Sequence, residues 1–173
     1  MKKTLFWSIF LAIVCAGISL SANYNKDDIS KIVITEKDIP SGFVIGKLPE
    51  KVKDVLKDNP WFFDSEAIKR LTGHIYPDGD YKKVAAMHMT ILADEKRPYR
   101  DNMVCWVILY KDSQGAKEEL AKLNRYTGFN SDRCILIQKN NMAVFMYSRD
   151  VNDFQYVQDV AEEIQAKIKA MQG

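Results

Sequence analysis

The chain has 173 residues, of which 47% are hydrophobic, 11% aromatic and 28% charged. This balance excludes collagen-like, low-complexity and wholly disordered chains, and the length suits one domain of ordinary size. The 25 lysines and arginines stand against 23 aspartates and glutamates, so the chain lacks the basic excess that a nucleic-acid-binding protein needs.

The first 22 residues differ in composition from the rest. Two lysines precede an uncharged apolar run of 16 residues, from Leu5 to Leu20, and small residues follow it. This pattern is typical of a secretory signal peptide, and the run is shorter than the roughly 20 residues that span a bilayer. We predict that residues 1–22 are a signal peptide and that the protein is exported, to a periplasm or outside the cell. Cleavage would leave 23 basic and 23 acidic residues.

Two alternatives concern the same segment. The first is that the segment stays uncleaved as a membrane anchor. The second is lipidation of Cys15, against which the branched Val14 directly before it argues. Either alternative would attach the protein to a membrane through its leader.

The spacing of apolar residues predicts the elements of the remaining chain. In chain order they are a flexible polar segment over 23–31, a strand at 31–35, a turn at 39–42, a strand at 43–45, helices over 50–58 and 65–72, strands over 83–93 and 102–111, a helix over 113–126, a hairpin of strands 133–139 and 142–148, and a helix over 152–171.

This order repeats a strand-strand-helix unit, which predicts one α+β domain over residues 32–173. We expect a four-stranded, largely antiparallel sheet with both long helices on one face. The strand over 103–110 is apolar on both faces, and the strand over 142–147 nearly so, so the second face also needs a cover. The candidates are the N-terminal strand and short helices over 32–72, a second subunit, or an apolar ligand, and we favour the first.

One loop collects side chains that could form a polar binding site. It contains His74, Tyr76, Asp78, Asp80 and Tyr81, that is, an imidazole, two carboxyl groups and two phenols. The competing interpretation is a structural Pro-Asp-Gly turn, in which aspartate serves local hydrogen bonds.

Three aromatic residues, Trp61, Phe62 and Phe63, follow a predicted helix stop at Asn59-Pro60. If exposed, they would mark an interaction surface for a partner. The alternative is that they cover an edge of the core.

Two cysteines, Cys105 and Cys134, lie near the starts of two strands that a helix connects. An exported protein can form a disulfide between them if these strands are parallel neighbours, and the alternative is two buried free thiols. The sequence Met87-His88-Met89 has copper-binding side chains. Alternation along a strand points His88 away from both methionines, so we predict no metal site.

The segment Asp38-Ile39-Pro40-Ser41-Gly42-Phe43, close behind a predicted leader, resembles the opening of small secreted or lipid-anchored bacterial envelope proteins of unknown function. The resemblance implies a compact α+β domain ending in a strand hairpin and a helix. It implies no activity and no catalytic residue.

No phosphate loop, dinucleotide fingerprint, Gly-x-Ser-x-Gly or His-Glu-x-x-His motif occurs, and no cofactor is predicted. Our leading hypothesis is a non-enzymatic binding module of a bacterial envelope, whose partner is a protein or an apolar small molecule. The alternatives are a hydrolase that uses His74 with Asp78 or Asp80, and a homodimeric structural subunit.

Overall fold

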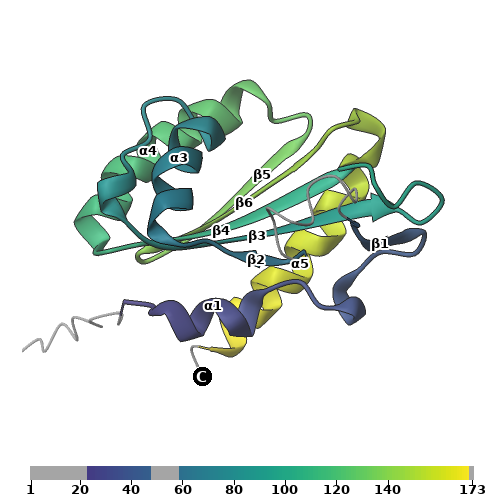
Figure 1. Cartoon of the computed structure of the whole chain (residues 1–173), viewed down its shortest axis with the longest axis horizontal. Coiled ribbons are helices and arrows are strands. Elements are labelled where there is room, and N and C mark those ends of the chain that lie inside the picture. The colour runs from purple at the N-terminus through teal and green to yellow at the C-terminus, as the bar shows by residue number, and fades with distance from the viewer. Residues whose placement is uncertain (1–22, 48–58, 172–173) are drawn as a thin grey trace, which may run out of the picture.

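The computed structural model describes residues 23–47 and 59–171 (Figure 1). The predicted signal peptide and the predicted helix over 50–58 lie outside the described residues. The helices are α1 (Lys26–Ile32), α3 (Ser65–Ile75), α4 (Ser113–Phe129) and α5 (Phe154–Ala170). The strands are β1 (Phe43–Ile45), β2 (Trp61–Phe62), β3 (Val84–Asp94), β4 (Met103–Tyr110), β5 (Cys134–Lys139) and β6 (Met142–Ser148).

The predicted α+β class is confirmed, and the sheet has six strands rather than four. The strand order is β1-β3-β4-β6-β5, with β2 beside β3, and every pairing among these strands is antiparallel. The two strand-strand-helix units are β3-β4-α4 and β5-β6-α5. No helix in the described part of the chain is long and apolar enough to cross a membrane.

The prediction that both long helices share one face is wrong. Helices α3 and α4 cover one face of the sheet, and α1 and α5 cover the other (Figure 1). All eight residues of β4 are buried: Trp106 and Ile108 point toward α3 and α4, whereas Cys105 and Val107 point toward α1 and α5. A central strand that is apolar on both sides needs a helix layer on each side, which explains the arrangement.

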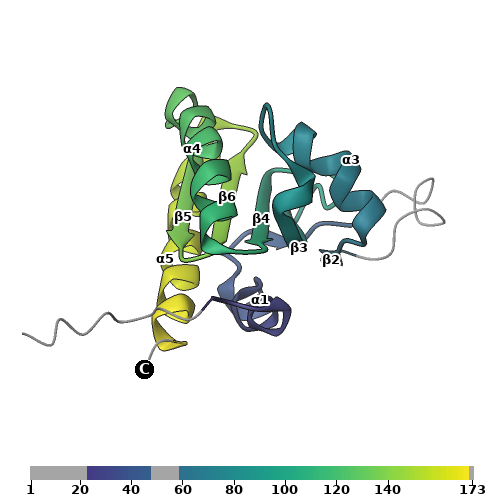
Figure 2. The same cartoon turned by 90° about the vertical axis from the view of Figure 1, so that its left-hand side faces the viewer.

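The segment 23–31, predicted to be flexible, contains most of helix α1. Asn25 Oδ1 accepts hydrogen bonds from the backbone N–H groups of Asp27 and Asp28, and Asp28 accepts one from the Asn25 N–H. This capping box starts the helix, and Ile29 and Ile32 are fully buried in the same cluster as α5. In both Figure 1 and Figure 2, α1 lies beside α5. No strand occurs at 31–35, because α1 continues to Ile32.

The segment Asp38–Phe43 joins the N-terminal region to α5. The Asp38 carboxylate accepts hydrogen bonds from the backbone N–H and hydroxyl of Thr35, and from Lys167 Nζ at 2.5 Å. Burial alone would raise the pKa of Asp38, but these hydrogen bonds lower it below its usual value. Gly42 has a φ of +86°, which glycine adopts without strain and which turns the chain into β1. In this chain the segment therefore has a structural role.

The candidate disulfide is absent, and Cys105 and Cys134 are free. Strand β6 lies between the two strands that carry them, so they are about two strand spacings, or roughly 10 Å, apart. A disulfide needs Cα atoms within about 7 Å. They also lie on opposite faces of the sheet. The condition for this disulfide, that the two strands be neighbours, is not met, because β6 separates β4 from β5.

We therefore expect both thiols to be reduced but slow to react. Burial raises the pKa of Cys105 to about 12 and that of Cys134 to about 11, and the thiolate is the reactive form. In native protein at pH 8, iodoacetamide should label Cys134 slowly and Cys105 not at all. After unfolding without reductant, peptide mass spectrometry should find both labelled. Two peptides that label only after reduction would contradict this expectation.

Candidate functional site

A cleft lies on the sheet between α3 and α4 and has a volume of about 170 Å³. Residues from both helices and from three strands or strand ends form it. The lining residues include Leu71, His74, Trp106, Tyr126, Arg133 and Tyr147. It opens above the α3/α4 face of the sheet, one of the two apolar faces of β4 and β6.

Strand register gives the cleft its aromatic floor. Trp106 on β4 pairs with Phe145 on β6, and Tyr147 pairs with Cys134 on β5, so all four side chains point to the α3/α4 face. The ring centroids of Phe145 and Tyr147 are 5.8 Å apart, and those of Phe145 and Tyr126 are 6.0 Å apart. These distances suit aromatic packing, so the floor is apolar and built from mutually supporting rings.

The two helices that form the walls start at aspartate caps. Asp64 accepts a hydrogen bond from the Ala67 N–H at the start of α3, and Asp112 accepts one from the Gly115 N–H at the start of α4. Such caps satisfy backbone N–H groups that the first turn leaves open. The helix predicted over 65–72 is longer in the structure, where α3 continues to Ile75.

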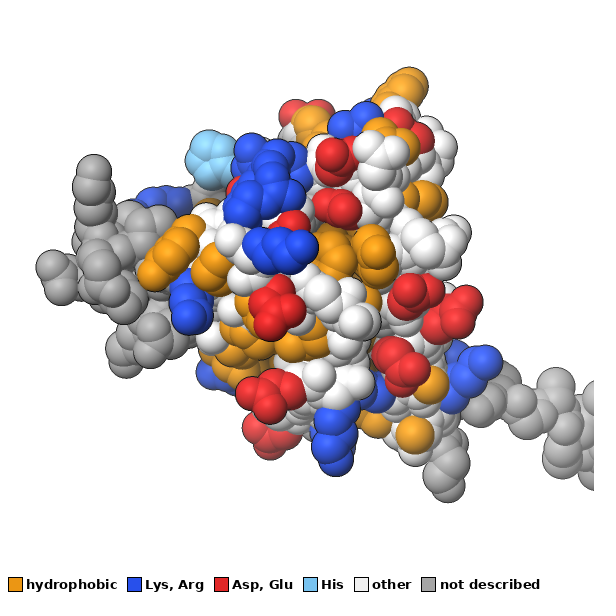
Figure 3. All heavy atoms as spheres, turned by 90° about the vertical axis from the view of Figure 1, so that its right-hand side faces the viewer, with side chains coloured by type: hydrophobic (Ala, Val, Ile, Leu, Met, Phe, Trp, Pro, Cys, Tyr) orange, Lys and Arg blue, Asp and Glu red, His pale blue; other side chains and the backbone are white. Residues whose placement is uncertain are grey.

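Polar groups surround the mouth of the cleft. His74 is exposed in the last turn of α3. At the end of α4, Asn130 lines the cleft and donates a hydrogen bond from its side-chain nitrogen to the Tyr126 carbonyl. Burial raises the pKa of Tyr147, so its phenol stays protonated and can donate a hydrogen bond. On the side drawn in Figure 3, lysine and arginine side chains gather beside a histidine.

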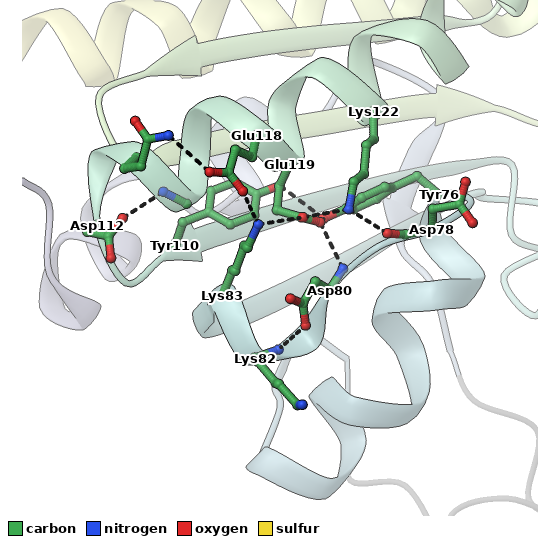
Figure 4. A network of polar contacts seen from close by, with 12 residues as sticks. Tyr76, Asp78, Asp80, Lys82, Lys83, Tyr110, Asp112, Glu118, Glu119 and Lys122 are labelled. Atoms are coloured by element: carbon green, nitrogen blue, oxygen red, sulfur yellow. Dashed lines mark hydrogen bonds and ion pairs between the residues drawn. The ribbon is translucent and has the colours of Figure 1, made fainter.

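The loop that follows α3 is fixed to α4 by one buried carboxylate, Glu119 (Figure 4). Glu119 has no exposed surface. Its Oε2 accepts hydrogen bonds from the Tyr76 hydroxyl and the Asp80 N–H, both at 2.8 Å, and its Oε1 accepts one from Lys122 Nζ at 2.8 Å. Lys83 Nζ lies 3.8 Å from Oε1. A buried charge is stable only when it is paired and hydrogen-bonded in this way.

The turn in this loop is also structural. Asp78 has a φ of +61°, and its carbonyl accepts a hydrogen bond from Lys122. A Cβ at Gly79 would lie 2.9 Å from Thr72 atoms, so only glycine fits between the turn and α3. The loop thus packs against α3 and is hydrogen-bonded to α4, so it fixes the two helices relative to each other.

The structure therefore separates the five residues predicted as one polar site. His74 lines the cleft, and Tyr76 is buried against Glu119. The side chain of Asp80 accepts a hydrogen bond from the Lys82 N–H, and the ring of Tyr81 lies under Lys69 Nζ at 5.9 Å. Asp78 lines a second, smaller depression with Tyr126 and Phe129. Among the described residues no hydrogen bond joins His74 to either aspartate.

The three predicted surface aromatics also have different surroundings. Trp61 is buried, and Phe63 stacks on Trp106 with centroids 5.7 Å apart. Phe62 is 47% exposed and packs edge-on against His88 at 4.6 Å. Trp61 and Phe63 therefore support the sheet, and Phe62 alone presents a large apolar surface.

His88 is buried on the face opposite the cleft. Neither ring nitrogen has a hydrogen-bond partner, and burial lowers its pKa to about 4. Met87 and Met89 pack on the α3/α4 face, as alternation along a strand predicts. No group of three or more histidine, cysteine, aspartate or glutamate side chains in the described ranges could hold a metal ion.

Sequence reasoning found His74 but missed the other polar residues of the cleft. Asn130 and Arg133 lie at a helix end and in the following connection, where polar residues are common and carry no signal of their own. The available signal was the doubly apolar character of β4 and β6, which predicted that something covers this face.

Comparison of the chain with protein-family models, curated proteins and solved structures gives no match.

Proposed function

We propose that the chain is an exported, non-enzymatic binding module that takes the ring-sized apolar part of a ligand into the cleft between α3 and α4. The observation that carries this proposal is the cleft itself, with an aromatic floor and a few polar groups at its mouth. That combination is the usual composition of a small-ligand site. Export rests on the predicted leader over residues 1–22.

The size of the cleft sets the size of the group that fits. An apolar cavity of roughly 150 Å³ holds a benzene molecule, and this cleft measures about 170 Å³. One aromatic ring or a branched aliphatic group therefore fits. Hiding ~150 Å² of ring surface contributes about 4 kcal/mol, which corresponds to a Kd near 1 mM for the ring alone. A natural ligand needs further contacts at the mouth.

The test is calorimetric titration with indole and with benzyl alcohol, two neutral ring compounds. We expect binding in the millimolar range by the unaltered chain. Leu71→Trp should abolish it by filling the cleft, since Leu71 lines it. Arg70→Trp, at the exposed neighbouring position of α3, is the matched control and should bind normally. Equal binding by all three proteins, each folded by circular dichroism, would reject the cleft as the site.

The homodimer remains a second prediction without a supporting observation. Sheet-on-sheet association needs an uncovered sheet face, and helices cover both faces in the described ranges. The hydrolase hypothesis also lacks support, because His74 and the two aspartates make separate contacts. We therefore develop the binding module alone.

A further inference from the structure

We infer that the ligand of this cleft carries a carboxylate next to its ring, held at the mouth by Arg133 and His74. The inference rests on the function proposed above and adds the chemical class of the ligand. The ring would lie against Trp106 and Tyr147, and the carboxylate would point out of the cleft.

The charges around the cleft favour an anion. Among the described residues, Arg133 and His74 are the basic ones that line it, and no aspartate or glutamate does. The adjoining depression shares Tyr126 and adds Lys122 and Arg125 against the single acid Asp78. A site lined by one sign of charge attracts the opposite sign, most strongly where the walls are apolar.

Arg133 is available to a ligand. Its Nε and Nη2 donate to the neighbouring Asp132 at 3.2 and 3.1 Å, and its Nη1 has no partner among the described residues. Both side chains of this ion pair are exposed, by 39% and 55%. Exposed pairs contribute little to stability. A ligand whose ring is bound in the cleft can therefore place its carboxylate against Arg133, either beside the Asp132 carboxylate or in its place. A guanidinium group matches a carboxylate through paired N–H donors.

Neutral hydrogen-bond donors near Arg133 are also suited to bind the ligand carboxylate. The hydroxyls of Tyr126 and Tyr147 have no hydrogen-bond partner among the described residues, and both side chains line the cleft. His74 likewise makes no side-chain hydrogen bond there. A carboxylate accepts several hydrogen bonds at once. The opposite ligand class, a quaternary ammonium group, would find the aromatic rings favourable but would be repelled by Arg133.

The experiment compares N-acetylphenylalanine with its amide, which differ only in the carboxylate, by titration calorimetry on the full chain. We expect the acid to bind at least about ten-fold more tightly, because hydrogen bonds to charged groups are the stronger class. Arg133→Gln should remove this preference. Arg97→Gln removes another exposed arginine that is paired with an acid, Asp94 at 3.0 Å, and should leave the preference intact.

Further probes separate the outcomes. Binding of 3-phenylpropionate as tight as that of N-acetylphenylalanine would identify a free small acid as the ligand class. Much weaker binding of 3-phenylpropionate would identify a peptide ending in an aromatic residue. Equal binding of acid and amide would overturn the inference while leaving the ring-binding function intact. Tightest binding of benzyltrimethylammonium would also overturn it, in favour of a cation site. Failure of all ring probes would reject the proposed function as well.

Discussion

Glu119→Ala should destabilise the protein by about 3 kcal/mol, the scale expected when one partner of a buried charged network is removed. The substitution leaves the Tyr76 hydroxyl and the Asp80 N–H without their acceptor, and Lys122 without its carboxylate partner. Urea unfolding followed by circular dichroism measures the change. Because the network fixes the loop after α3 to α4, the variant should also bind ring compounds less tightly.

The adjacent residue is the matched control for this substitution. Glu118 is also on α4 and also pairs with Lys83, but about half of its side chain is exposed. Glu118→Ala should change stability by less than about 1 kcal/mol. Glu119→Gln keeps an acceptor for Tyr76 and Asp80 but loses the charge, so its effect should lie between the other two. Similar losses for Glu118→Ala and Glu119→Ala would show that the buried network does not hold the loop.

Acidification from pH 8 to pH 5 should cost the protein about 2 kcal/mol of stability through His88 alone. An unfolded histidine has a pKa near 6.5, whereas burial lowers the pKa of His88 in the folded state to about 4. The unfolded chain therefore binds the proton more readily. The contribution of neutral His88 is fully present above pH 6.5 and is lost as the pH falls from there toward 4.

His88→Leu should remove this part of the pH dependence and should stabilise the protein, because neither ring nitrogen of His88 has a partner to lose. The control is His74→Gln, since the sequence has two histidines and His74 is exposed. It should keep the slope of the unaltered chain. The test is to measure the free energy of unfolding of each protein at pH 8, 6.5 and 5. If the free energy of unfolding of His88→Leu falls with pH as steeply as that of the unaltered chain, other groups cause the acid sensitivity.

The element order of the second half was predictable because its apolar periodicities are long. The strands over 84–94, 103–110 and 142–148, and the helices over 113–129 and 154–170, match the expected elements to within a few residues. The side of the sheet that each helix covers was not predictable. A strand that is apolar on both faces is compatible with helices on either side, so its pattern assigns no helix to a face. The placement of β6 between β4 and β5 was also not visible in the sequence. The same placement ruled out the disulfide.

The N-terminal helix α1 shows a second limit. Its seven residues hold two buried isoleucines among lysines and aspartates, too few to reveal a helical period. The capping box that starts at Asn25 was present in the sequence but indicates only where a helix can begin. Burial of Ile29 and Ile32 against α5 completes the helix, and that contact joins residues far apart in the chain.

The candidate site shows why residue types alone were a poor guide. The loop rich in polar groups, from His74 to Tyr81, turned out to be mainly structural, because Glu119 on a distant helix binds Tyr76 and the Asp80 backbone. The cleft instead forms from residues of two helices and three strands or strand ends, each unremarkable in its local sequence. Trp106 and Tyr147 come together only through the register of β4 and β6.

The central claim is that a ring binds between α3 and α4, and intermolecular NOEs test it most directly. With 3-phenylpropionate as the probe, we expect NOEs from its ring protons to the side chains of Trp106 and Tyr147. The claim would be contradicted by a bound probe whose NOEs reach only exposed aromatics outside the cleft, such as Tyr99, which is 60% exposed. It would equally be contradicted if indole, benzyl alcohol, N-acetylphenylalanine and 3-phenylpropionate all failed to bind at millimolar concentration.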